Sequence, residues 1–87
     1  MKLVNIGYGN MINSARIVSI VSPEAAPIKR LVQDTRNTGK LVDATGGKKT
    51  RSVIVSDSGH IVLSALTSES IQGRINGAAA DEQEEDE

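Results

Sequence analysis

The stretch "RSVIVSDSGHIVLSAL" at residues 51–66 decides the fold of this chain. Two runs rich in β-branched residues, "RSVIVS" at 51–56 and "HIVLSAL" at 60–66, flank the segment "DSGH" at 57–60. Runs of this kind predict strands, and Asp, Ser and Gly together predict a tight turn between them. The stretch therefore predicts a β-hairpin, around which the other segments can be placed.

The residues before this hairpin predict a third strand next to it. "KLVDAT" at 40–45 has strand composition, and "GGKK" at 46–49 joins it to the hairpin. Paired glycines favour the tight reversal of a two-residue hairpin loop. We therefore expect a β-meander over 40–66, with Lys48 and Lys49 at one hairpin tip.

The segment "SPEAAPIKRLVQDTRNTG" at 22–39 changes to a helical period. We expect Ser22 to cap the helix, Pro23 and Pro27 to fall in or near its first turn, and Gly39 to stop it. The positions at i, i+3, i+4 and i+7 that define its inner face are Ile28, Leu31, Val32 and Thr35.

The two ends of the folded part carry shorter elements. "LVNIGYGN" at 3–10 predicts a short strand that stops at Gly7 and Gly9, where a turn needs positive φ. "ARIVSIVS" at 15–22 predicts a second strand, and "TSESIQGRI" at 67–75 a short helix. The fold class is therefore α+β: a mostly antiparallel sheet with one main helix and a short C-terminal helix.

The size of the chain predicts oligomerisation. Its 87 residues allow one domain, which we assign to residues 1–76, followed by an acidic segment at 77–87 that we expect to be disordered. A domain this small buries only roughly 60% of the surface that its unfolded chain exposes. Because the chain has no cysteine, disulfides cannot compensate, and a homo-oligomer is the expected alternative.

Charge is divided unevenly along the chain. The last seven residues, "DEQEEDE", hold six of the eleven acidic groups, so residues 1–80 carry ten Lys and Arg against five acids. This asymmetry favours a polyanionic partner for the folded part. No apolar run approaches the roughly 20 residues of a membrane helix, and no signal-peptide layout is present, so we expect a cytoplasmic protein without membrane contact.

Motifs for catalysis or cofactor binding are incomplete. A phosphate-binding loop around "GGKK" would need glycine in place of Val42 and Ser or Thr in place of Lys49. Gly7 and Gly9 lack the third glycine of a dinucleotide-binding fingerprint. His60, the single histidine, fits a turn residue with local hydrogen bonds better than a catalytic or metal-binding group. We therefore expect no enzyme, no cofactor, no metal site and no small-molecule substrate.

The basic residues give the stronger indication, although a solvated face is an equally ordinary interpretation of them alone. With Tyr8 as the only aromatic residue, a base-stacking platform for single strands or RNA is not expected. One long helix also fits a helix-turn-helix poorly. Phosphate contacts to duplex DNA remain, and an oligomeric scaffold for acidic proteins is the alternative. The candidate residues are Arg16, Lys29, Arg30, Arg36, Lys48, Lys49 and Arg51.

Three segments resemble the RemA family of bacterial DNA-binding regulators, which activate extracellular-matrix (biofilm) genes in spore-forming bacteria. They are "NIGYGN" at 5–10, "RIVSIVSPEAAPIKRL" at 16–31 and "DATGGKKTRSVIVSDSGHIVLSA" at 43–65. The resemblance implies a β-rich domain related to the LytTR type. It also implies a ring of about seven or eight subunits with DNA around its rim.

The same resemblance implies which residues contact DNA. The basic contacts of the family map onto Arg16, Lys48 and Lys49, with Arg51 beside them. Where the family has a "YGRRTR"-like segment, this chain has "GGKKTR" at 46–51. Lysine keeps the charge of arginine but lacks its two-pronged fork for phosphate or guanine. The acidic residues 81–87 are expected to compete with DNA for these cations.

Overall fold

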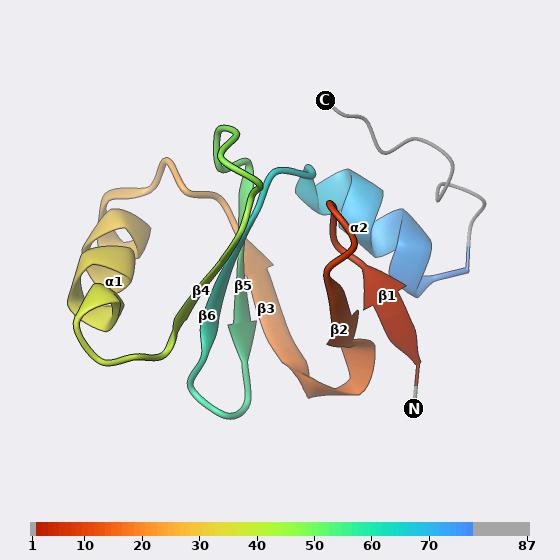
Figure 1. The fold of residues 1–87 in the computed structure, drawn as a ribbon, viewed down its shortest axis with the longest axis horizontal. Helices are drawn as coiled ribbons and strands as arrows, with labels where there is room; N and C mark the ends of the chain where they lie inside the picture. The colour runs from red at the N-terminus through yellow and green to blue at the C-terminus, as the bar shows by residue number, and fades with distance from the viewer. Residues whose placement is uncertain (1, 78–87) are drawn as a thin grey trace.

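The computed structural model describes residues 2–77 as three layers (Figure 1). A four-stranded sheet lies in the middle, helix α1 (Ala26–Arg36) covers one face, and a two-stranded hairpin with helix α2 (Ser68–Ile75) covers the other. The strands are β1 (Leu3–Asn5), β2 (Met11–Asn13), β3 (Ile17–Val21), β4 (Leu41–Ala44), β5 (Ser52–Ser56) and β6 (Ile61–Ser64). The α+β class, the mostly antiparallel pairing and both helices are thus confirmed. The acidic segment after Gly77 lies outside the described residues.

The central sheet has the order β3-β5-β6-β4, and the expected meander is wrong. The β5–β6 hairpin is present, but β4 pairs in parallel with β6, in a register that sets Leu41 opposite Ile61. All four residues of β6 are buried, so this strand needs a neighbour on each side. It therefore separates β4 from β5. Lys48 and Lys49 lie on a connection that crosses the end of β6, not at the tip of a paired hairpin.

Helix α1 begins later than the sequence pattern indicates. Its N-cap is Ala25 and Pro27 lies in its first turn, whereas Ser22 accepts a hydrogen bond from the Glu24 amide in the preceding turn. A helix starting at Pro23 would bring the Pro27 ring against the carbonyl four residues earlier, so the later start is the unstrained one. The predicted inner face is correct: Ile28, Leu31 and Val32 pack against the sheet. No helix among the described residues is long and apolar enough to cross a bilayer.

The second face of the sheet is covered by elements that the sequence showed only in part. Strand β2 was not expected, and a 3₁₀ turn at Ser14–Arg16 delays the start of β3. The β1–β2 hairpin is tied down by the buried Ser64 hydroxyl, which donates to the Ile6 carbonyl at 2.8 Å. Arg74 of α2 also donates to the Asn5 carbonyl, at 3.0 Å. These bonds fix the hairpin relative to the sheet.

Replacing Ser64 should loosen this attachment. Its hydroxyl also accepts from the Leu66 amide at 3.0 Å, so Ser64→Ala leaves two buried backbone groups without that partner. We expect a loss of about 1–3 kcal/mol in the free energy of unfolding. Ser58→Ala also removes two hydroxyl contacts, to Ser56 and His60, but they are exposed and water can replace them. It should therefore change the free energy of unfolding by less than about 0.5 kcal/mol. Urea denaturation of both variants checks this, and equal losses would contradict it.

Candidate nucleic-acid interface

Residues 45–51, called the basic turn below, carry three of the predicted site residues. The Lys48 amide donates to the Thr45 carbonyl at 3.0 Å, and Gly46 and Gly47 between them have φ of +63° and +83°. Two central residues at positive φ mark a type I′ reversal, which glycine adopts without steric cost. The side chains of Lys48, Lys49 and Arg51 project from the turn and are exposed to solvent.

An aspartate closes the base of the basic turn. The Asp43 carboxylate accepts from the Thr45 hydroxyl at 2.6 Å and from the Thr45 amide at 2.9 Å. These two bonds, the hydroxyl first, lower the pKa of Asp43. Burial opposes them, and nearby Arg36 adds a smaller lowering. Stability from this contact is therefore full above the ordinary pKa of an aspartate and is lost as pH falls through the lowered value. At neutral pH the turn is closed.

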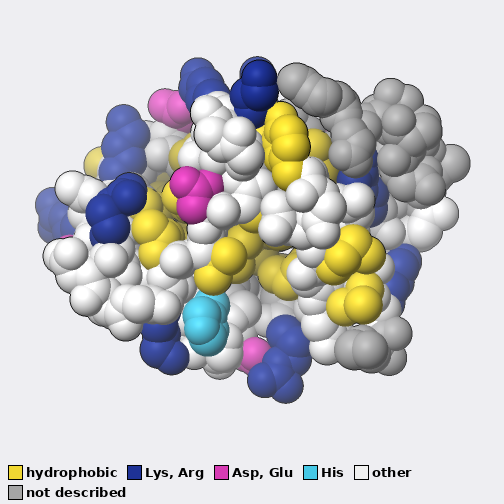
Figure 2. Space-filling view, viewed as in Figure 1, with side chains coloured by type: hydrophobic (Ala, Val, Ile, Leu, Met, Phe, Trp, Pro, Cys, Tyr) yellow, Lys and Arg dark blue, Asp and Glu magenta, His cyan; other side chains and the backbone are white. Residues whose placement is uncertain are grey.

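The positively charged surface extends from the basic turn to helix α1. Lys49 and Arg51 line a shallow cavity of about 190 Å³, together with Thr50 and Pro23. Thr50 and Pro23 also line a neighbouring cavity of about 280 Å³, whose other walls include Lys29 and Arg36. Figure 2 shows Lys and Arg side chains along this margin of the molecule, over the β4–β5 connection and α1, with acidic side chains among them. The basic surface thus consists of Lys29, Arg36, Lys48, Lys49 and Arg51.

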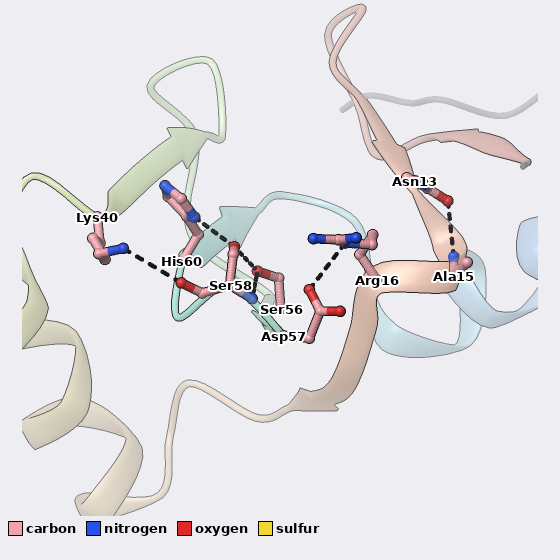
Figure 3. Close-up of polar contacts among 8 residues, drawn as sticks. All are labelled: Asn13, Ala15, Arg16, Lys40, Ser56, Asp57, Ser58 and His60. Carbon is pink, nitrogen blue, oxygen red and sulfur yellow. Dashed lines mark hydrogen bonds and ion pairs between the residues drawn. The ribbon is translucent and has the colours of Figure 1, made fainter.

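Arg16 lies at the other end of the sheet. Its Nε contacts the Asp57 carboxylate at 3.0 Å, and both side chains are about half exposed (Figure 3). In the β3–β5 ladder Ile17 pairs with Ser56 and Val21 with Val53, so Arg16 and the basic turn flank opposite ends of β5. Five strand residues span roughly 17 Å. Within one chain the structure therefore does not bring Arg16 together with Lys48, Lys49 and Arg51.

A hydrogen-bonded turn holds Asp57 in front of Arg16. The Ser58 hydroxyl bonds to Ser56 Oγ at 2.7 Å and to His60 Nδ1 at 2.6 Å, so His60 makes the local contacts expected of it (Figure 3). Lys40 Nζ donates to the Ser58 carbonyl at 3.4 Å. Lys40 is thus an exposed cation at this turn that the sequence analysis did not single out.

Acidic side chains accompany both basic sites, and sequence reasoning missed them. Glu24 lines the cavity that contains Lys49 and Arg51, and Asp57 pairs with Arg16. Both acids are distant from these cations in sequence, so no spacing rule could have found them. Phosphate would have to displace these weak, exposed partners. Among residues 2–77, no three His, Asp or Glu side chains gather as a metal site would need.

Comparisons with known proteins agree with the sequence resemblance. A family model described as "RemA-like: Extracellular matrix regulatory protein A-like" matches residues 3–75. A protein of Dictyoglomus thermophilum is 60% identical over 83 residues, which cover 95% of this chain and 98% of the relative. A protein of Geobacillus thermodenitrificans is 56% identical over 78 residues, or 90% of each chain. Both relatives bear the name "Putative regulatory protein".

Proposed function

Because the chain belongs to the RemA-like family of regulatory proteins, we propose that it is a homo-oligomeric transcriptional regulator that holds duplex DNA by its phosphates. The contacts are made by Arg16, Lys48, Lys49 and Arg51. The assembly is a ring of about seven or eight subunits of a LytTR-related domain, which acts in the cytoplasm on extracellular-matrix genes.

The observation that supports DNA binding most strongly is the basic turn itself. The backbone beneath Lys48 is held by the hydrogen bond from the Lys48 amide to the Thr45 carbonyl and by the Asp43 carboxylate, which accepts from the Thr45 amide. A fixed backbone presents cations at set positions, which lowers the ordering cost of binding a regular polyanion. Lys29 and Arg36 extend the positive surface beyond the turn.

Two features favour a ring. Both edge strands of the sheet, β3 and β4, carry exposed valines: Val18 is 65% and Val42 44% exposed. Edges of this kind invite pairing with another chain. Contacts between two different surfaces of one subunit close into rings when the rotation allows it. A ring would also repeat Arg16 and the basic turn around its circumference, so that both sites reach one bent duplex.

The test is titration of a fluorescent duplex with the wild-type oligomer, whose size is first established by light scattering. We expect binding that weakens steeply as salt rises, because each neutralised phosphate releases counterions. An intact oligomer without duplex affinity at physiological salt would contradict the proposal and would favour the scaffold for acidic proteins.

Removing the competing acids should strengthen DNA binding. Asp57→Asn frees Arg16 from its partner, and Glu24→Gln removes the carboxylate beside Lys49 and Arg51. Exposed pairs contribute little, so we expect each variant to bind up to about fivefold tighter. Asp34→Asn is the matched control, since it makes the same charge change on an exposed position of α1 that lines neither cavity of the basic surface. If all three variants gain DNA affinity equally, the tighter binding comes from the change in net charge and not from the release of these cations.

A further inference from the structure

Tyr8 lies against the basic turn although it belongs to a different layer of the fold. A Cβ atom built on Gly46 would stand 2.9 Å from Tyr8 Cγ and 3.0 Å from both Cδ atoms. Such close approach to three atoms of one ring means that the ring lies directly against the bare backbone of Gly46. The β1–β2 connection and the β4–β5 connection lie at the same end of the sheet (Figure 1).

The backbone around Tyr8 is itself fixed. Tyr8 has φ of +54°, a region that residues with a side chain seldom occupy. Four hydrogen bonds enclose it: the Asn10 amide and side chain both donate to the Gly7 carbonyl, the Ile6 amide donates to the Asn10 carbonyl, and the Gly7 amide donates to Asn5 Oδ1. The ring therefore projects from a rigid turn at a position that glycine would fill with less strain.

The basic turn needs support from outside because its flanking strands do not pair. A type I′ reversal is normally held by the two strands that it joins, but here β6 lies between β4 and β5. The reversal also contains two adjacent glycines, Gly46 and Gly47, which lose more conformational freedom on ordering than any other residues. The hydrogen bonds of Asp43 hold one end, and the Tyr8 ring covers the first glycine.

We propose that Tyr8 is a positioning residue of the DNA site: its ring holds Gly46 and so fixes the direction in which Lys48 and Lys49 leave the turn. The inference rests on the proposed function for its effect on DNA. It rests on the structure alone for its effect on the order of the turn. Without the ring, the same charges are present, but DNA has to order the turn when it binds.

Three variants separate the ring from other contributions. Tyr8→Gly removes the ring and suits the positive φ, so the hairpin keeps its fold. Tyr8→Phe keeps the ring and removes the hydroxyl. Leu3→Ala is the control, because it truncates another half-exposed large side chain of the same hairpin, at the end opposite the turn that carries Tyr8.

Two measurements are made on each variant: the NMR order parameters of the Gly46, Gly47 and Lys48 amides, and duplex affinity across a salt series. For Tyr8→Gly we expect lower order parameters in the turn and an affinity weaker by about two- to tenfold, the cost of ordering a side chain or two on binding. The slope of log affinity against log salt should not change, because no cation has been removed. Tyr8→Phe and Leu3→Ala should match the wild type.

The outcomes distinguish this inference from the proposed function. Wild-type order parameters and affinity in Tyr8→Gly would overturn the inference and leave DNA binding standing. Loss of affinity in Tyr8→Phe equal to that in Tyr8→Gly would overturn it too, since the hydroxyl and not the ring would then be responsible. If the wild type binds no duplex, the proposed function fails, and the order parameters alone decide whether Tyr8 fixes the turn.

Discussion

Lys48→Ala/Lys49→Ala is expected to weaken duplex binding by about 60-fold at 0.1 M salt. The figure follows from counterion release: a slope of about −0.9 per phosphate contact corresponds to roughly an eightfold effect for each contact at that salt concentration. Repetition of the turn in an oligomer would increase the loss. The slope of log affinity against log salt should also become shallower by about two for each subunit that touches the DNA.

The control for this pair removes the same charge elsewhere. Arg30→Ala/Lys2→Ala deletes two cations that belong to neither basic site, since Arg30 lines neither cavity of the basic surface and Lys2 contacts the end of α2. We expect a small, nonspecific weakening and little change in the slope. If the two double variants lose affinity equally, the basic turn has no special part in binding DNA. Light scattering must first show that both keep the wild-type oligomer.

The second large effect concerns stability, at Ile54. This side chain is fully buried in β5, between β3 and β6, and packs with Ile6 and Ile71 in the core beneath the hairpin and α2. Ile54→Ala removes buried methyl groups and leaves a cavity, which costs about 2–5 kcal/mol. A small domain has only roughly 5–15 kcal/mol in total. The midpoint of thermal unfolding should therefore fall by roughly 10 °C or more.

Val18→Ala is the matched comparison, because Val18 is also a β-branched strand residue but is 65% exposed. Within its own subunit, its truncation should change the unfolding free energy by less than about 0.5 kcal/mol. A larger loss is expected only from subunit contacts, and it would depend on protein concentration. Both variants are compared with the wild type by calorimetry at several matched protein concentrations, since oligomerisation stabilises by mass action. An Ile54→Ala protein that melts with the wild type would contradict the assigned core. A concentration-dependent loss in Val18→Ala would place the β3 edge between subunits.

Helices and strands could be predicted from the sequence where their signals, hydrophobic periodicity and turn-forming residues, lie within one short segment. The β5–β6 hairpin follows from two β-branched runs around "DSGH", and the inner face of α1 follows from Ile28, Leu31 and Val32. Strand order could not be predicted in the same way. The glycines of "GGKK" do reverse the chain, as their composition indicates, but nothing local shows that the buried β6 has to lie between the strands they connect.

The candidate site, too, could be predicted from the sequence only in part. The exposure of Arg16, Lys48, Lys49 and Arg51 agrees with their polar character and loop positions. Their neighbours depend on the tertiary fold. Tyr8 meets Gly46 across 38 positions of sequence, and two layers of the fold must assemble before that contact exists. The acids beside the cations could not be predicted for the same reason. The DNA-contact role of the four basic residues stays a prediction.

The most direct test of the account is to cleave DNA from the basic turn itself. The chain has no cysteine, so Lys48→Cys and Gln72→Cys each offer one thiol for an iron–EDTA reagent, the second on the exposed side of α2. We predict strong backbone cleavage of bound duplex from position 48 and weaker cleavage from position 72, which lines a cavity with Ile17 next to Arg16. Cleavage from position 72 alone, by protein that still binds the duplex, would show that DNA meets another face and would contradict the account.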